Sequence, residues 1–227
     1  MKIGVLGTGM VGQTISGKLL ELGHDVMVGT RNVAQTLART EPYATGFPAF
    51  SVWQQQHPDA KLGTYADAAQ HGELAVNATN GIGSLEALEL AGAAHLAGKL
   101  LIDIANPLDF SQGMPPSLTV CNTDSLGEQI QRAYPDVRVV KTLNTVTAFL
   151  MVDPGQVADA DHTMFVCGND AAAKTQVTAW LKEWFGWKDV IDLGDISNAR
   201  GMEMWLPLWV RLFGTLQTGM FNLKIVR

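Results

Sequence analysis

The stretch KIGVLGTGMVGQTISGKLLELGHDVMVGT, residues 2–30, decides the fold. It opens with a short apolar run at residues 3–6 and continues into a glycine turn. Apolar residues then recur every three or four positions over residues 11–22, which predicts a helix that ends at Gly23. A second apolar run follows at residues 26–28. Strand, turn, helix and strand within about thirty residues are typical of a unit that binds a dinucleotide.

Three glycines of this stretch, Gly7, Gly9 and Gly12, have the spacing G-x-G-x-x-G. The first allows a tight turn out of the strand, the second lets a pyrophosphate approach the backbone, and the third lets helix and strand pack closely. The helix that begins near Met10 points unpaired N–H groups and the positive end of its dipole at the phosphates. Because the motif lies between a predicted strand and a predicted helix, it indicates a dinucleotide site. A glycine-rich turn in an ordinary α/β domain is the structural alternative.

The end of the second strand, Gly29-Thr30-Arg31-Asn32, bears on the choice of nucleotide. Sites for NAD usually carry an Asp or Glu about 20 residues after the glycine turn, and this chain has no acid there. A guanidinium at Arg31 suits a 2′-phosphate, and Thr30 and Asn32 add short hydrogen-bonding side chains. Such a charge-assisted contact is worth about 1.5–3 kcal/mol. The sequence therefore predicts NADP(H), with Arg31 as the start of a solvated loop being the alternative.

The composition is that of an ordinary globular protein: 227 residues, 47% of them hydrophobic and 17% charged. We expect a dinucleotide-binding domain with an extended sheet over residues 1–195 and a C-terminal helical extension over residues 196–227. The net charge of −6 provides no basic surface for nucleic acid or an anionic membrane. Cys121 and Cys167 lie far apart, which indicates free thiols in a reducing, cytoplasmic environment. No apolar run approaches the ~18 residues of a membrane span.

Strand-like and helix-like segments alternate along the rest of the chain. This alternation predicts an α/β protein of the Rossmann type, with a doubly wound, mainly parallel sheet flanked by helices. Further strands are expected at residues 61–65, 74–79, 100–105, 137–143, 163–167 and 190–193. Helices are expected at residues 33–39, 66–70, 84–96, 125–133, 171–185 and 198–219, and an irregular segment at residues 42–60. Pro207 should kink the last helix or mark its start.

In such sheets the ligand lies outside the carboxyl ends of the strands. Small and amide-bearing residues predominate at several of these strand ends, which suits a flat ring and its carboxamide. The expected cofactor-binding residues are Gly7, Thr8, Gly9, Met10, Val11, Gly12, Thr30, Arg31, Asn32, Asn77, Ala78, Thr79, Ala105, Asn106, Pro107 and Asn144.

The sequence identifies no catalytic residue. It has no nucleophile elbow, no H-E-x-x-H helix and no paired Cys/His metal ligands, so we expect no metal. Lys141, which precedes Asn144 on one strand, is a candidate proton donor. Hydride transfer between stacked rings needs little from side chains beyond holding the rings about 3–3.5 Å apart and excluding water. The apolar stripe of Trp205, Trp209 and Phe213 is interpreted as ordinary packing, as a pocket wall for a planar cofactor or as a contact with a second subunit.

The glycine turn followed by Val-Gly-Thr-Arg-Asn at residues 28–32 resembles the NADPH-dependent reductases of the deazaflavin coenzyme F420. Further similar segments follow, namely FVCGND at 165–170, DLGDISNAR at 192–200, LPLWVRLF at 206–213 and FNLKI at 221–225. The cytosolic NADPH domains of the six-transmembrane metalloreductases are also similar, including the strand end at residues 104–107. The resemblance implies a deazaflavin or flavin stacked on nicotinamide and a homodimer that uses the C-terminal helix. It also implies NADP contacts at Thr8, Gly9, Met10, Val11, Thr30, Arg31 and Asn32.

One departure from this family leaves the hydride acceptor open, because the archaeal enzymes align a histidine with Asn144. The leading hypothesis is an NADP(H) oxidoreductase that transfers hydride between NADPH and a deazaflavin or flavin. The first alternative is an NADPH-dependent reductase of a small carbonyl or imine. The second is a non-catalytic NADP(H) sensor.

Overall fold

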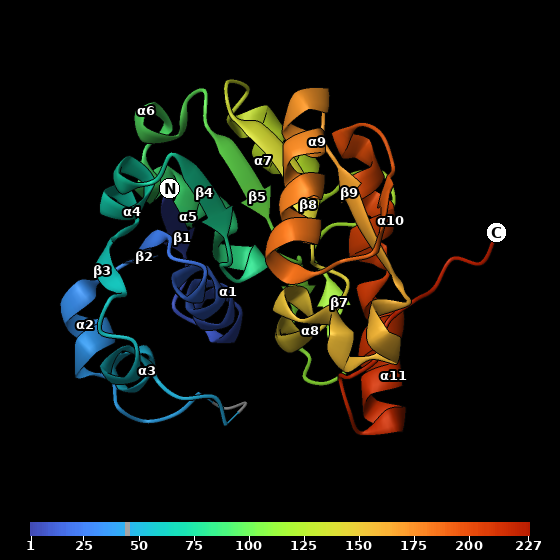
Figure 1. Ribbon diagram of the computed structural model, residues 1–227, viewed down its shortest axis with the longest axis horizontal. Helices are drawn as coiled ribbons and strands as arrows, with labels where there is room; N and C mark the ends of the chain where they lie inside the picture. Colours follow the sequence, from blue (N-terminus) through green and yellow to red (C-terminus); the bar gives the residue numbers. More distant parts are fainter. Residues whose placement is uncertain (44–45) are drawn as a thin grey trace.

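A single eight-stranded sheet with the order β10-β9-β8-β5-β4-β1-β2-β3 forms the centre of the molecule (Figure 1). It was obtained as a computed structural model, which describes residues 1–43 and 46–227. The strands are β1 (Lys2–Leu6), β2 (Asp25–Thr30), β3 (Lys61–Thr64), β4 (Leu74–Asn77), β5 (Leu100–Asp103), β8 (Arg138–Thr142), β9 (Thr163–Cys167) and β10 (Asp189–Asp192). The predicted Rossmann-type fold is confirmed, and the chain reverses its direction across the sheet between β1 and β4, the usual position of the ligand.

The sheet is parallel from β3 to β8, and its last two strands run the other way. β9 pairs antiparallel with β8, Lys141 lying opposite Cys167, while β10 runs parallel to β9. The connection from β8 to β9 carries the short helix α8 (Ala148–Val152) and two 3-10 turns. Antiparallel neighbours need no crossover helix, so β9 can begin at the edge of the sheet at which β8 ends.

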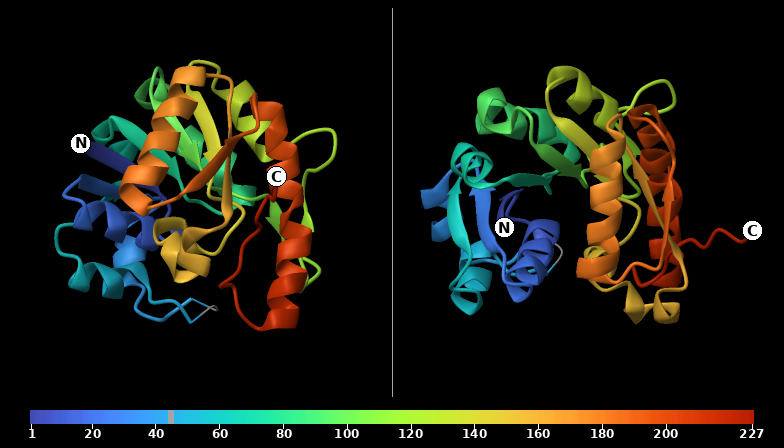
Figure 2. Two further views of the ribbon diagram at one scale, coloured as in Figure 1. Left: turned by 45° about the vertical axis from the view of Figure 1, so that its right-hand side comes forward. Right: turned by 45° about the horizontal axis from the view of Figure 1, so that its top comes forward.

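The strands contribute side chains to two separate hydrophobic cores, one on each face of the sheet, because successive side chains of a strand point to opposite faces. In β5, Leu100 and Ile102 face one core and Leu101 the other. The first core is covered by α1 (Met10–Glu21), α3 (Phe50–Gln56), α8 and α9 (Ala171–Trp180). The second is covered by α4 (Tyr65–His71), α5 (Ser84–Ala91), α6 (Ala93–Leu96), α7 (Leu126–Ala133) and α10 (Ala199–Met204). Figure 2 shows these helices on both sides of the sheet.

Two expected helices begin where the sequence indicated. Ser125 caps α7 by accepting a hydrogen bond from the Glu128 N–H, and Pro207 lies in the first turn of α11 (Leu206–Leu216). The helix expected at residues 84–96 is instead divided into α5 and α6 at Gly92, whose φ is +87°. The first residue of α5 is Ser84.

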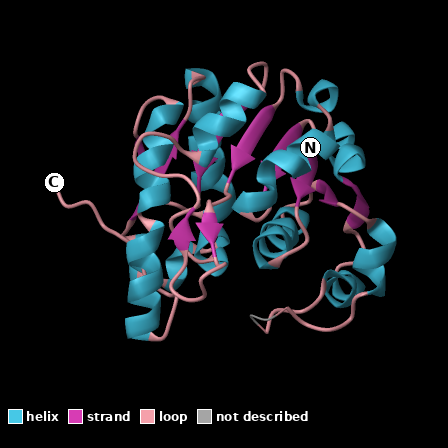
Figure 3. Ribbon diagram, turned by 180° about the vertical axis from the view of Figure 1, so that it is seen from behind, coloured by secondary structure: helices cyan, strands magenta, loops and turns pink. Residues whose placement is uncertain are grey.

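Two helices and one hairpin were not expected from the sequence. The segment 42–60 contains α3, although residues 44–45 within it lie outside the described residues. Helix α8 was also missed. In the Pro-rich loop, β6 (Leu108–Asp109) and β7 (Ser117–Leu118) pair as an antiparallel hairpin, which stands beside α11 (Figure 3).

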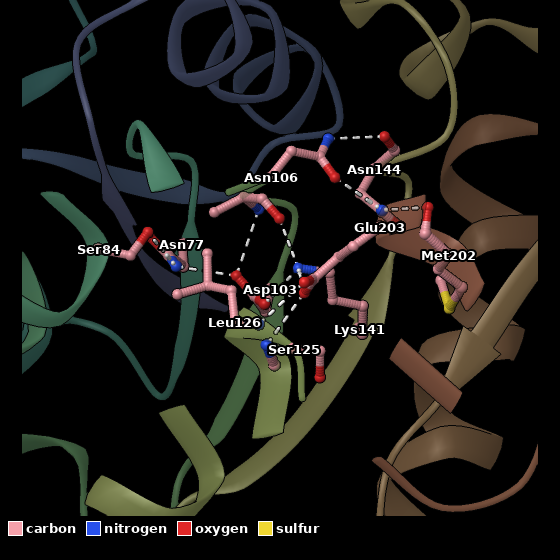
Figure 4. A network of polar contacts seen from close by, with 12 residues as sticks. Asn77, Ser84, Asp103, Asn106, Ser125, Leu126, Lys141, Asn144, Met202 and Glu203 are labelled. Carbon is pink, nitrogen blue, oxygen red and sulfur yellow. Dashed lines mark hydrogen bonds and ion pairs between the residues drawn. The ribbon is translucent and has the colours of Figure 1, made fainter. Parts of the chain in front are cut away.

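A buried ionic cluster of Lys141, Asp103 and Glu203 joins the sheet to the C-terminal helices (Figure 4). The Lys141 Nζ lies 2.8 Å from Asp103 Oδ2 and 2.9 Å from Glu203 Oε1, and all three side chains are at most 1% exposed. Glu203, on α10, also accepts hydrogen bonds from the backbone N–H groups of Leu126 and Gly127 at 2.8 and 3.0 Å. One carboxylate thus holds a strand and the beginning of α7 together.

Burial alone would lower the pKa of Lys141, but attraction to Asp103 and Glu203 outweighs burial, so its pKa is raised. Lys141 therefore stays protonated and the cluster stays ionic. A buried charge whose partner is removed cannot be rehydrated, and for this reason such pairs are costly to break.

We expect Glu203→Ala to lower the free energy of unfolding by about 3–5 kcal/mol, because it removes one of the two carboxylates that pair with the buried Lys141 and leaves two backbone N–H groups without an acceptor. Urea denaturation followed by tryptophan fluorescence measures this loss. Glu183→Ala, an exposed acid without an ion pair among the described residues, should change stability by less than about 0.5 kcal/mol. A loss below about 1 kcal/mol in Glu203→Ala would contradict the importance of the cluster.

Candidate nucleotide-binding and hydride-transfer site

The glycine turn between β1 and α1 is built from backbone contacts. Gly7 has a φ of +121°, and its N–H donates to the Gly29 carbonyl at 3.0 Å. A Cβ on Gly12 would lie 2.0 Å from the Gly7 carbonyl oxygen, so any larger residue would push α1 away from the turn. A Cβ on Gly9 would meet nothing within 4 Å. The turn is therefore tightly closed on the helix side and open beside Gly9.

Two side chains that sequence reasoning missed hold this turn in place. The Thr8 carbonyl accepts hydrogen bonds from Gln13 Nε2 at 2.9 Å and from the Tyr43 hydroxyl at 3.1 Å. Gln13 is completely buried and also donates to the Pro48 carbonyl at 3.1 Å. Because a trans peptide is planar, fixing the Thr8 carbonyl also fixes the Gly9 N–H, which points the opposite way. No signal in the sequence pairs Tyr43 with the turn.

At the end of β2, the three residues expected near the adenosine ribose have different partners. The Thr30 hydroxyl lies 2.7 Å from that of Thr36, and Asn32 Oδ1 accepts the Gln35 N–H at 3.0 Å as the cap of α2 (Val33–Ala38). Arg31 is exposed, and its Nη2 donates to Glu86 Oε2 on α5 at 2.8 Å. The expected cation is therefore at the surface beside the turn, together with an acid that lies far away in the sequence.

A cavity of about 410 Å³ opens at the carboxyl ends of β1, β4, β5 and β8. Eight of the expected residues line it together: Gly9, Met10, Val11, Ala78, Thr79, Ala105, Asn106 and Asn144. The strand-end rule thus brings residues from four separate segments to one place. Asn77 and Pro107 do not line the cavity.

Asn77 lies beneath the cavity wall, completely buried. Its Nδ2 donates to Asp103 Oδ1 at 2.8 Å and to Ser84 Oγ at 3.2 Å, and its Oδ1 accepts from the Thr79 hydroxyl at 2.7 Å. The amide therefore positions Thr79, which does line the cavity. Figure 4 shows the same amide beside Asp103 of the ionic cluster.

The side chains of Asn106 and Asn144 face each other on the side of the cavity that the sheet forms (Figure 4). Asn106 Nδ2 donates to the Asn144 carbonyl at 2.8 Å, and Asn144 Nδ2 donates to Asn106 Oδ1 at 2.9 Å and to the Met202 carbonyl at 3.2 Å. Asn144 Oδ1 is buried and has no hydrogen-bond partner in the described part of the chain. An acceptor without a donor beside a cavity fits a ligand that carries an N–H group.

The structure removes Lys141 as a candidate proton donor. Its ammonium group is completely buried in the ionic cluster, and it also donates to the Ala105 carbonyl behind the cavity wall. Lys141 is not among the residues that line the cavity, and its raised pKa keeps the proton in place.

The remaining wall comes from segments that sequence reasoning did not place at the site. The residues around α8, the β6–β7 hairpin and α11 contribute Val146, Thr147, Ala148, Met151, Leu108, Phe110, Leu206 and Trp209. Only Trp209 carried a signal, since it lies in the stripe interpreted partly as a pocket wall. Its ring stacks on Phe213 and Phe221 at centroid distances of 5.6 and 5.4 Å. This wall is mostly apolar and can cover a flat ring.

The residues present fit a bound NADP. The open space beside Gly9 leaves room for a diphosphate to approach the backbone of the turn, Arg31 provides an exposed cation at the end of β2, and the cavity accommodates a ring. Among residues 1–43 and 46–227, no group of His, Cys, Asp and Glu is arranged to hold a metal ion. In the same residues, no helix combines the length and apolar character needed to cross a bilayer.

Residues 2–107 match the family model of the coenzyme F420-dependent NADP oxidoreductases. A candidate F420-dependent NADP reductase from Arthrobacter sp. FB24 is 60% identical over the full length of both chains, with a TM-score of 0.95.

More distant relatives share part of their length with this chain. Human metalloreductase STEAP2 is 29% identical over 214 residues, which are 93% of this chain and 36% of the relative, so the chain spans about a third of that protein. An imine reductase from Myxococcus stipitatus in complex with NADP+ is 20% identical, with 96% of this chain and 64% of that chain covered and a TM-score of 0.60, and it shows the shared fold.

The match at the dinucleotide-binding unit and the full-length relative agree with the geometry of the turn and the cavity. The chain belongs to the family of coenzyme F420-dependent NADP oxidoreductases.

Proposed function

We propose that this protein transfers hydride between NADPH and a deazaflavin or flavin whose ring lies in the cavity against the nicotinamide. The observation that carries the proposal is the chemistry of the cavity wall. None of the described residues that line it is titratable. Bound NADPH supplies the hydride, which a deazaflavin accepts at C5 and a flavin at N5. The added negative charge spreads over the ring, and the ring takes up its proton at N1 from solvent, so no side-chain proton donor is needed beside the hydride acceptor. The wall's task is to orient two rings and exclude water.

Each part of NADPH has a proposed set of contacts. The Gly9, Met10 and Val11 backbone at the start of α1 faces the diphosphate, as helix N-termini do in this fold. Arg31 binds the 2′-phosphate, with Thr30 and Asn32 beside it. The nicotinamide lies along Ala78, Thr79, Ala105, Asn106 and Asn144.

The same wall argues against reduction of a small carbonyl or imine. That reaction leaves a negative oxygen or nitrogen that must be protonated, and enzymes usually place an acid near it. The only polar side chains among the described lining residues are those of Thr79, Asn80, Asn106, Asn144, Thr147 and Trp209. A ring that spreads the added charge fits this wall better.

Anaerobic mixing of the protein with NADPH and a deazaflavin should bleach the deazaflavin absorbance.

Phe110, which is 48% exposed and lines the cavity, should contribute to binding of the acceptor through contact with its ring. Phe110→Ala is expected to raise KM for the acceptor about threefold to tenfold without changing NADPH affinity. Phe149→Ala, at a phenylalanine that is 45% exposed and does not line the cavity, is the matched control and should change KM by less than about twofold.

Other results of this assay would redirect the assignment. NADPH oxidation only with carbonyl or imine compounds would support the first alternative. Tight NADPH binding without turnover of any acceptor would support a sensor. Both results would refute hydride transfer to a deazaflavin or flavin.

Arg31→Ala is expected to weaken NADPH binding about tenfold to a hundredfold, because a charge-assisted contact to the 2′-phosphate is lost. NADH binding should change by less than about twofold. Arg138→Ala removes the same charge at the start of β8, whereas Arg31 follows the end of β2, so the two residues lie at opposite ends of the parallel strands. Arg138→Ala should leave the affinities for NADPH and NADH unchanged. Titration calorimetry measures all of these constants, and an unaltered preference for NADPH in Arg31→Ala would refute the role of Arg31.

We also propose that the protein acts as a homodimer in the reducing cytosol. Both cysteines are free thiols, as proteins of that compartment usually have. Met204, Leu208, Leu212 and Leu216 recur every four residues along α10 and α11, where all but Leu212 are at least 45% exposed. An apolar stripe on the outside of a helix fits a second copy of the same helix.

Leu208→Glu should shift the protein from dimer to monomer in sedimentation experiments, because it places a charge at the centre of the stripe. Leu22→Glu, at the C-cap of α1 and 40% exposed, provides a matched control that should leave the dimer intact. A monomeric wild-type protein at micromolar concentration would contradict the dimer.

A further inference from the structure

Arg31 is paired with an acid that comes from a distant part of the sequence and not from the segment around β2. Glu86 belongs to the first turn of α5, and its Oε2 accepts a hydrogen bond from Arg31 Nη2 at 2.8 Å across a sequence separation of 55 residues. Dinucleotide sites that take NAD usually place an acid at the end of the second strand. Here the end of β2 provides a cation, and a neighbouring helix provides the acid.

The ion pair is isolated and lies at the surface. The Arg31 and Glu86 side chains are 61% and 56% exposed, and neither has another hydrogen bond in the part of the chain that the structure describes. A pair this exposed is weak, since water competes with both groups. It can therefore open when a stronger anion reaches the guanidinium, and a phosphate dianion is such an anion.

We propose that Glu86 is a specificity-determining residue that opposes NADP(H) by competing with the 2′-phosphate for Arg31. This inference rests on the proposed binding of the 2′-phosphate at Arg31. With NADP(H), the guanidinium must turn from the carboxylate toward the phosphate, and part of the binding energy is spent on opening the pair. With NAD(H), which has no 2′-phosphate, the pair stays closed and no such loss occurs.

Glu86→Gln tests this competition with little change in side-chain size. NADPH should bind about threefold to fivefold more tightly, which corresponds to the strength of an exposed ion pair, while NADH affinity should change by less than about 1.5-fold. Glu89→Gln removes the same charge from the exposed side of α5, where Glu89 has no ion pair among the described residues, and should change neither affinity.

A second background separates competition from simple repulsion between Glu86 and the phosphate. If Glu86 acts through Arg31, the gain from Glu86→Gln should fall below about 1.5-fold when Arg31 is already alanine. An equal gain in that background would overturn the proposal, because the carboxylate would then act on the phosphate directly. Unchanged NADPH binding in Glu86→Gln would also overturn the proposal. Weaker NADPH binding would overturn it too, by showing that Glu86 holds Arg31 in its binding position.

Failure of this inference can be told apart from failure of the proposed function. If wild-type protein does not bind NADPH, or if Arg31→Ala has no effect on it, the proposed cofactor site is wrong. If wild-type binding and the Arg31 effect are both present but Glu86→Gln does not strengthen NADPH binding, only the competition is wrong.

Discussion

The buried ion pairs of Lys141 with Asp103 and Glu203 are the constraint on which the site depends. They lie where β5 and β8 end, and they hold the peptide groups around Ala105, since Lys141 binds its carbonyl and Asp103 accepts its N–H at 3.2 Å. Through Asn77 the same cluster reaches Thr79, and through Glu203 it reaches α7 and α10. The cavity wall and the C-terminal helices are thus fixed to one set of charges. Displacement of α10 would take Glu203, one of two carboxylates, away from the buried Lys141.

Local patterns in the sequence were sufficient for the elements nearest the nucleotide. The glycine spacing and the apolar periodicities that follow depend on contacts within thirty residues, and the structure has β1, the turn, α1 and β2 in the expected order. The strand at Thr163–Cys167 also has the expected bounds. The direction of this strand does not follow from its sequence, because an apolar strand has the same residue pattern whether its neighbour is parallel or antiparallel. Helix α3 was missed for a related reason, since proline and glycine before it suggested a loop and only packing of Phe50 and Trp53 against the core reveals the helix.

The candidate site likewise contains residues that the sequence could identify and residues that it could not. Residues at strand ends could be selected because topology alone brings strand ends together, and Ala105 and Asn144 reach one cavity for that reason. Glu86 could not be selected, because its position beside Arg31 depends on how α5 lies across the sheet. Tyr43 reaches the turn from a segment without a periodic pattern. The wall formed by α8 and α11 depends on which face each helix turns inward, and an apolar stripe such as that of Trp209 cannot distinguish a core from a pocket.

The reversal of direction at β9 has a consequence for how such a chain can diversify. The connection from β8 to β9 remains at one edge of the sheet, and Val146, Thr147, Ala148 and Met151 on this connection line the cavity. Leu108, Phe110, Leu206 and Trp209 also line it. In the proposed placement of the cofactor, the residues at the diphosphate and the 2′-phosphate lie within residues 7–32, far from these wall residues in the sequence. Substitutions in the later part of the gene could then change the proposed hydride acceptor while the contacts to both phosphate groups are inherited unchanged.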